Sequence, residues 1–284
     1  MHDEQQYERQ RATLMRGLFP ALARDVDAAF DAVEHSRPGN TGKTSEFEAQ
    51  LGAEVQQFQQ RHAALAWHSL EDVSARDRVL DAFTTAREVL RGSSIELPAP
   101  ESFAAIVDFE RVTELLGAGA RPGSTLAVVP APHGIGLEGW SELFRLVAQR
   151  FSQELNPGEP LIVGSEAERE FAQLDAPVAG VPATSGWTLR LIPAAPAPAL
   201  LGLNFEHGPH VSLPEMLMLQ LMRIVSGHEP LDQASFTWLA GELAGGKLAA
   251  RHVYDIADRA VRVSCREIGN QGPHLGARTP LALG

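Results

Sequence analysis

The sequence is short of several residues on which whole classes of protein depend. It has a single cysteine, Cys265, among 284 residues. One thiol cannot form an intramolecular disulfide, a CxxC redox pair or a zinc site that needs two thiolates. Lysine is almost absent too: only Lys43 and Lys247 occur, so arginine carries nearly all of the positive charge.

Long hydrophobic runs are also missing. The most apolar stretch, residues 213–225, contains Glu215, Gln220 and Arg223, and a membrane-spanning helix needs about 20 predominantly apolar residues. The first residues have neither the basic start nor the apolar segment of a secretory signal. We therefore expect a cytoplasmic protein that does not insert into a membrane.

The charge balance excludes another class of partner. Acidic side chains outnumber basic ones by 36 to 24, giving a net charge of −12, and the excess is spread along the chain. No basic stripe with interleaved aromatic residues occurs. Nucleic-acid binding without sequence preference depends on neutralising phosphates with Lys and Arg, so we expect no nucleic-acid partner. The 44% apolar fraction is that of a globular protein.

Residues 5–92 have apolar side chains at helical spacing, which predicts a helical hairpin or small bundle. Its last helix is expected to start with Ser74 as N-cap and to bury Leu80, Phe83 and Leu90. A bundle this small needs another surface to cover its apolar stripes. We therefore expect these helices to pack on the following region or to mediate self-association.

The composition changes between residues 92 and 100, where Gly, Ser and Pro mark a linker. This change predicts two domains, a helical region over residues 1–98 and an α/β domain over residues 99–284. The expected fold class is a helix-rich α/β protein. Its N-terminal helical region is expected to pack on a C-terminal domain with a mixed, partly parallel sheet.

Strand and helix patterns alternate in the second region. Strands are expected over residues 125–130, 160–164, 187–192 and 261–266. Helices are expected over residues 109–116, 140–155, 166–174, 213–225 and 236–243. The order over residues 125–174 predicts a βαβ unit. The helix after Ser212 opens with a capping box completed by Glu215 and is apolar nearly all round, which predicts burial.

A glycine-rich turn follows the first expected strand. Gly134, Gly136 and Gly139 match the GxGxxG pattern between a strand and a helix, where bare backbone can approach a phosphate at a helix N-terminus. The spacer of residues 130–133 and a misplaced ribose-binding acid depart from the dinucleotide fingerprint. The turn is therefore either a nucleotide or anion site or a plain strand-to-helix connection.

Three Pro-His pairs lie in glycine-rich loops and contribute His133, His210 and His274. Imidazole titrates near neutral pH and serves as a general acid or base. With His207 and Glu206, these rings offer ligands for a hydrolytic metal site. No pair has HExxH spacing, so we assign no metal. The other interpretation is that these histidines are solvated or stabilise turns.

Cys265 is the third residue of an alternating apolar pattern that also contains Val261 and Val263. No activating base stands beside it in the sequence. We therefore expect an inert core thiol rather than a nucleophile.

Several segments of the C-terminal half carry a family resemblance. They are residues 187–193, 199–203, 208–210, 236–239 and 272–276. Together they resemble an uncharacterised actinobacterial protein family of unknown function, and the preference for arginine over lysine fits a bacterial source of that kind. The resemblance covers about residues 100–284. It implies that the Gly-Pro-His loops recur and implies no catalytic residue.

These features predict a soluble binding or interaction protein whose α/β domain holds a small ligand, for which an anion is the candidate. The alternative is an enzyme that acts on an anionic or nucleotide-like substrate at the glycine-rich turn. In that case His133, His210 or His274 would supply acid–base or metal chemistry. Because no complete catalytic constellation can be written, the binding function is favoured.

Overall fold

The structure is a computed structural model that describes residues 72–117, 125–201, 208–269, 272–281 and 283. The helices predicted before residue 72, and the self-association predicted for them, lie outside the described residues. By its internal contacts the chain divides into residues 1–61 and 62–284, and every described residue belongs to the second unit. The division predicted between residues 98 and 99 stays a prediction.

The larger sheet has six strands in the order β2–β7–β6–β5–β8–β4. The strands are β2 (Leu161–Val163), β4 (Ala199–Leu200), β5 (Phe236–Trp238), β6 (Leu248–Asp255), β7 (Ala260–Glu267) and β8 (Leu275–Ala277). The pairs β2–β7 and β5–β8 are parallel, and the other three pairs are antiparallel. The sheet is therefore mixed, as the sequence predicts.

A second sheet pairs β1 (Leu126–Pro132) with β3 (Trp187–Pro193) in antiparallel register. The βαβ unit predicted over residues 125–174 is therefore wrong, because β1 and β2 belong to different sheets. The reason is that strand partners are chosen over long sequence separations. The sequence order of strands and helices does not reveal that β1 pairs with β3 and β2 with β7.

Six α-helices and a 3-10 helix are described. They are α4 (Val73–Val89), η2 (Pro100–Ile106), α5 (Phe109–Leu116), α6 (Gly136–Arg150), α7 (Ser165–Arg169), α8 (Phe171–Leu174) and α9 (Leu213–Val225). The helix predicted over residues 236–243 is wrong, since this segment starts with β5. A short apolar run fits a buried strand and a buried helix equally well by periodicity. None of the helices in the described ranges has the length and hydropathy needed to cross a membrane.

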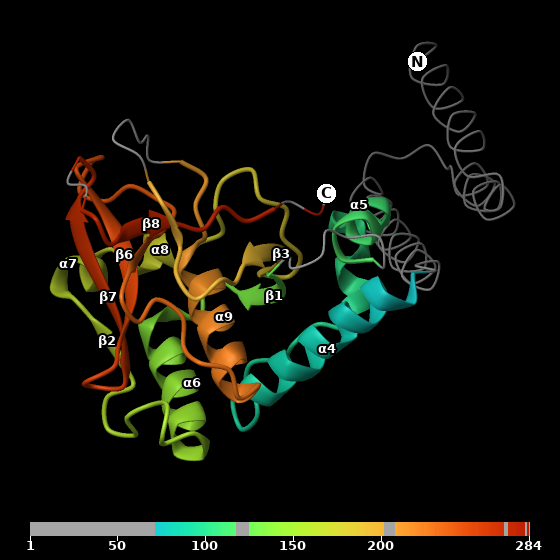
Figure 1. The fold of residues 1–284 in the computed structure, drawn as a ribbon, viewed down its shortest axis with the longest axis horizontal. Coiled ribbons are helices and arrows are strands. Elements are labelled where there is room, and N and C mark those ends of the chain that lie inside the picture. Colours follow the sequence, from blue (N-terminus) through green and yellow to red (C-terminus); the bar gives the residue numbers. More distant parts are fainter. Residues whose placement is uncertain (1–71, 118–124, 202–207, 270–271, 282, 284) are drawn as a thin grey trace, which may run out of the picture. The chain divides into compact units, whose positions relative to one another are not determined.

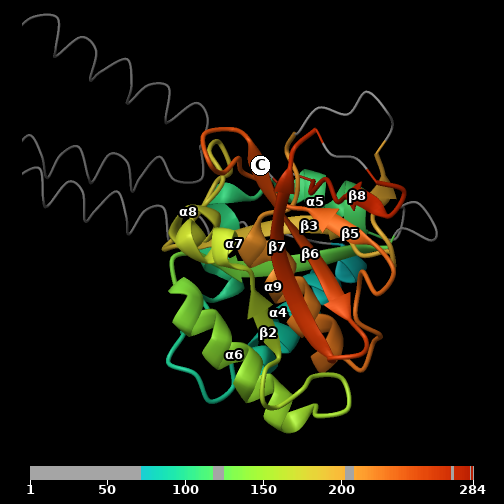
Figure 2. The same ribbon diagram turned by 90° about the vertical axis from the view of Figure 1, so that its left-hand side faces the viewer.

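The predicted capping box of α9 is confirmed. The Ser212 hydroxyl accepts a hydrogen bond from the backbone nitrogen of Glu215, and the Glu215 carboxylate accepts one from that of Ser212 at 2.9 Å. Nearly every residue of α9 is buried. The helix contacts β1 and α4 and lies behind β6 and β7, between the two sheets (Figures 1 and 2). It thus forms the centre of the core.

Helix α4 packs on α9 and β1 through a face that differs in part from the predicted one. Its N-cap is Asp72, whose carboxylate accepts a hydrogen bond from the backbone nitrogen of Ala75 at 2.9 Å, and not Ser74. Phe83 and Leu90 are buried as predicted, but Leu80 is 37% exposed. The buried face consists of residues spaced three or four apart, as on one side of an amphipathic helix: Ala75, Val79, Phe83, Ala86 and Val89.

Candidate functional site

The glycine-rich turn after β1 has a structural reason for its glycines. Gly134 and Gly136 have φ angles of +75° and +74°, a backbone conformation that residues with a Cβ rarely adopt. Gly139 lies within α6, where a Cβ would come within 3.2 Å of the Ile135 side chain. The pattern at these three positions is therefore accounted for by the turn and by packing within the helix.

Asp175 supplies a carboxylate at the N-terminus of α6. Its Oδ2 accepts a hydrogen bond from the Gly136 nitrogen at 2.7 Å, and its Oδ1 accepts one from Trp140 Nε1 at 2.9 Å. Because this carboxylate caps the first turn, α6 begins at Gly136 and not near Trp140 as predicted. Ligand binding by Gly134, Gly136 and Gly139 stays a prediction.

His133 follows β1 and is nearly buried. Its Nε2 lies 3.0 Å from the Thr188 hydroxyl, which in turn donates to the buried Glu215 carboxylate at 3.4 Å. Burial lowers the pKa of His133, and the nearby charges of Glu215 and Asp175 oppose this shift only in part. The ring is therefore neutral at pH 7 and belongs to a polar network between β3 and α9.

The other two predicted histidines have different surroundings. His210 is buried, and its Nε2 accepts a hydrogen bond from the Gly208 nitrogen of its own loop at 3.3 Å. His274 is exposed at the start of β8, where its carbonyl oxygen accepts from the Phe236 nitrogen at 2.7 Å. His210 thus stabilises its turn. A role for either ring in acid–base chemistry stays a prediction.

No group of three or more His, Cys, Asp or Glu side chains in the described part of the chain is arranged to hold a metal ion. Glu206 and His207, which the sequence suggested as metal ligands, lie outside the described residues. Cys265 is a free thiol on β7, half-buried, and burial raises its pKa to about 11. A thiol with a raised pKa is a poor nucleophile.

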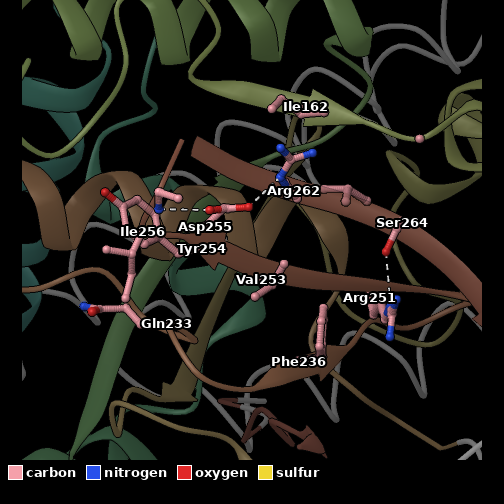
Figure 3. Close-up of a pocket in the computed structure, with 13 residues that line it drawn as sticks. Ile162, Gln233, Phe236, Arg251, Val253, Tyr254, Asp255, Ile256, Arg262 and Ser264 are labelled. Atoms are coloured by element: carbon pink, nitrogen blue, oxygen red, sulfur yellow. Dashed lines mark hydrogen bonds and ion pairs between the residues drawn. The ribbon is translucent and has the colours of Figure 1, made fainter. Parts of the chain in front are cut away.

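A cavity of about 570 Å³ opens on the face of the six-stranded sheet that points away from α9 (Figure 3). We call it the outer-face hollow. Figure 2 shows this face of β6 and β7 toward the viewer. The hollow is lined by Ile162, Gly164, Gln233, Phe236, Arg251, Val253, Tyr254, Asp255, Ile256, Ala257, Arg262, Val263 and Ser264.

The alternation of side chains along β6 creates this face. Arg251 and Val253 point outward into the hollow, whereas His252, between them, is fully buried on the inner face. On β7, Ser264 pairs directly with Arg251 and therefore shares its face. Gly164 has no side chain to fill the neighbouring position at the end of β2. Small residues beside larger ones leave the sheet surface concave at this point.

Arg262 forms one end of the hollow, and its charge is already neutralised. Its Nε donates to Asp255 Oδ2 at 2.9 Å, and its Nη2 donates to the Asp258 carboxylate. Asp255 Oδ1 also accepts from the backbone nitrogens of Ala257 and Asp258, which fixes the β6–β7 turn. This end of the hollow therefore carries two carboxylates and one guanidinium.

Arg251 has a different environment. Its Nε donates to the Ser264 hydroxyl at 3.1 Å, and its guanidinium carbon lies 4.1 Å from the centroid of the Phe236 ring (Figure 3). Among the described residues, no carboxylate lies within ion-pair distance of it. Burial, and secondly the charge of Arg266, lower the pKa of Arg251. Arg251 is thus a positioned cation without a counter-ion in the described chain.

A buried polar network anchors the wall of the hollow. Asp232, adjacent to the lining residue Gln233, is fully buried and accepts hydrogen bonds from Thr237 at 2.7 Å, His252 at 3.0 Å and Arg278. Burial alone raises the pKa of Asp232, but the bonds and charges of these neighbours outweigh it and hold that pKa below its ordinary value. The network fixes the segment that leads into β5.

Sequence reasoning placed no site in this region because it missed β6. Residues 248–255 contain two charged side chains and a histidine, which obscured their alternation. The usable signal was the period of two in Arg251, Val253 and Asp255, matched by Arg262 and Ser264 after a short turn. Such a pattern predicts a hairpin whose outward face combines charged and apolar groups.

Comparison of the chain with protein-family models, with curated proteins and with solved structures finds no match. The resemblance of residues 100–284 to an actinobacterial family stays a prediction.

Proposed function

We propose that the protein is a binding protein that holds a small anionic ligand in the outer-face hollow. Sites for small molecules typically measure about 300–1,000 Å³ and are lined mainly by apolar groups with a few placed polar ones. The hollow, at about 570 Å³, has this character. Ile162 and Val253 give an apolar floor, Phe236 adds an aromatic ring, and Arg251 supplies the charge.

The observation that carries the proposal is the position of Arg251. In a chain with a net charge of −12, a half-buried arginine without a counter-ion among the described residues is unfavourable by itself, because burial disfavours an unpaired charge. An anionic ligand in the hollow would supply the missing partner. The arginine therefore favours anions over neutral and cationic ligands.

Binding is favoured over catalysis by the chemistry of the lining. The described residues that line the hollow include no histidine, lysine or cysteine. Ser264, the serine of the lining, accepts a hydrogen bond from Arg251, and no base in the described part of the chain is hydrogen-bonded to its hydroxyl. A nucleophile needs an activating base within hydrogen-bond reach. The arrangement can hold and orient a ligand without an evident group to transform it.

The proposal is tested by closing the hollow. Val253→Trp places an indole on its floor, and Val73→Trp makes the same substitution at a site on α4 that is 57% exposed and outside the hollow. Ligand-observed NMR with a mixture of small aromatic and aliphatic acids, amides and amines measures binding. We expect the wild-type protein and Val73→Trp to bind acids and Val253→Trp to lose that binding. Undiminished binding by Val253→Trp contradicts the proposal.

Two proposals rest on composition and sequence pattern. We place the protein in the cytoplasm and expect self-association through the N-terminal helices. Light scattering of the intact chain tests the second. A mass that is a multiple of 30.7 kDa supports it, and a mass of 30.7 kDa contradicts it.

A further inference from the structure

We infer that the ligand of the outer-face hollow is an organic monocarboxylate, whose carboxylate group binds the free edge of the Arg251 guanidinium. This inference rests on the proposed function and adds the chemical class of the ligand.

The guanidinium of Arg251 is held at Nε and over an aromatic ring. Its Nε donates to the Ser264 hydroxyl, and its carbon lies over the Phe236 ring. Within the part of the chain that the structure describes, the two terminal nitrogens have no hydrogen-bond partner. Their N–H groups form a planar fork whose spacing matches the two oxygens of a carboxylate. The free edge is therefore suited to a bidentate carboxylate.

The charges that line the hollow favour a ligand with one negative charge over a ligand with two. Arg262 is the other guanidinium of the hollow, and Asp255 and Asp258 already bind it. With two carboxylates on one guanidinium, that end of the hollow has a net negative charge. The charge of Arg266 also acts on Arg251, but Arg266 does not line the hollow. A phosphate dianion in the hollow therefore meets the single guanidinium of Arg251 and is repelled by these aspartates. A carboxylate needs one cation and fits the charges present.

The remainder of the ligand is apolar. Between Arg251 and the Arg262 end, the floor is formed by Val253 and Ile162, and Ile256 at the turn is 59% exposed. Burying such surface is favourable by about 25 cal/mol per Å². A carboxylate that carries an aromatic or aliphatic body therefore gains from both parts of the hollow, whereas a small polar acid gains only from Arg251.

Three matched probes test the class of ligand. 2-Naphthoate, 2-naphthamide and 2-naphthyl phosphate share an aromatic body and differ in the charged group. The readout is the ¹⁵N–¹H NMR spectrum of the full-length protein, including the side-chain Nε–H signal of Arg251, identified by its loss in Arg251→Gln. We expect 2-naphthoate to bind at least about tenfold more tightly than the amide or the phosphate.

Variants of Arg251 test whether this residue binds the carboxylate of 2-naphthoate. Arg251→Gln removes the charge, and Arg251→Lys keeps it but removes the fork, so we expect the greatest loss of 2-naphthoate affinity in the first and an intermediate loss in the second. Arg145→Gln is the charge-matched control, because Arg145 lies on the exposed face of α6 and pairs with Glu142. An unchanged backbone spectrum shows that each variant is folded.

The outcomes separate the two proposals. Tighter binding of the phosphate overturns the carboxylate inference alone, and anion binding in the hollow stands if Val253→Trp abolishes that binding. Equal binding of amide and acid, or wild-type affinity for 2-naphthoate in Arg251→Gln, overturns both proposals, because both rest on the charge of Arg251. No binding of any probe in the millimolar range contradicts both.

Discussion

Asp175 Oδ2 lies 2.7 Å from the backbone nitrogen of Gly136, and the same carboxylate accepts a hydrogen bond from Trp140 Nε1. Asp175 is 1% exposed. A residue that follows α8 therefore caps the first turn of α6 and binds the indole in its second turn. The positive end of the α6 dipole is satisfied within the chain, which leaves the outer-face hollow as the better-supported ligand site.

Asp175→Ala removes both of these hydrogen bonds and takes this partner from the buried indole N–H of Trp140 and from the part-buried N–H of Gly136. Each unsatisfied buried donor costs about 1–3 kcal/mol, so we expect the free energy of unfolding to fall by about 3 kcal/mol. Urea denaturation measures it. Asp81→Ala, on an exposed position of α4, is the control and should change stability by less than about 0.5 kcal/mol. Equal effects of the two substitutions would show that the cap contributes nothing.

Gly276 allows β8 to approach β4 closely. A Cβ at this position would lie 2.4 Å from the Ala199 carbonyl oxygen and 2.9 Å from Pro198 Cγ. Gly276→Ala therefore forces the strands apart, and we expect a loss of about 1–3 kcal/mol, as in other overpacked sites. Gly272 lies in the turn before β8, where an added Cβ meets nothing within 4 Å among the described residues, so Gly272→Ala is the matched control. Thermal unfolding of both variants decides whether the close contact exists.

Arg278→Met breaks a buried ion pair. Arg278 is 1% exposed and donates to Asp232 and to the carbonyl oxygens of Pro193 and Ala195. Its loss takes the arginine from the buried Asp232 carboxylate, which keeps its hydrogen bonds with Thr237 and His252. Breaking a buried ion pair by removing one partner typically costs about 3–5 kcal/mol. The exposed pair of Arg111 with Glu114 provides the contrast, since Arg111→Met should cost under about 1 kcal/mol. Similar chemical denaturation midpoints for the two variants would contradict this account.

His133 makes stability depend on pH. Its folded-state pKa is lowered from the ordinary value of 6.5 by burial, so the unfolded chain binds more protons as the pH falls through about 6.5. Stability is therefore present above that pH and is lost below it, down to the folded-state pKa. His133→Gln should reduce the loss of unfolding free energy between about pH 7.5 and about pH 5.5. Parallel pH profiles for the two proteins would exclude this contribution.

The helices whose bounds were predicted correctly are those marked by short sequence patterns within the helix itself. Helix α9 follows from the Ser212–Glu215 capping box and an unbroken apolar run, and α5 has the bounds that its pattern indicates. The strand pairing could not be predicted, because β1–β3 and β2–β7 join segments far apart in the sequence. Side-chain periodicity carries no information about which strands meet.

In the candidate site, too, the sequence indicates local features but not contacts between distant segments. His133, His210 and His274 were singled out by their Pro-His loops, but the sequence does not reveal that Thr188 binds the first and Gly208 the second. No sequence motif marks Arg251. Its importance arises from the absence of a nearby carboxylate among the described residues, which depends on the three-dimensional arrangement.

The most direct test of ligand binding in the outer-face hollow is a titration of the full-length protein with 2-naphthoate, followed by the Arg251 Nε–H signal. The account predicts a saturable shift of this signal in the wild-type protein and in Val73→Trp, and no shift in Val253→Trp. A signal that stays fixed into the millimolar range, or that shifts equally in Val253→Trp, would contradict it.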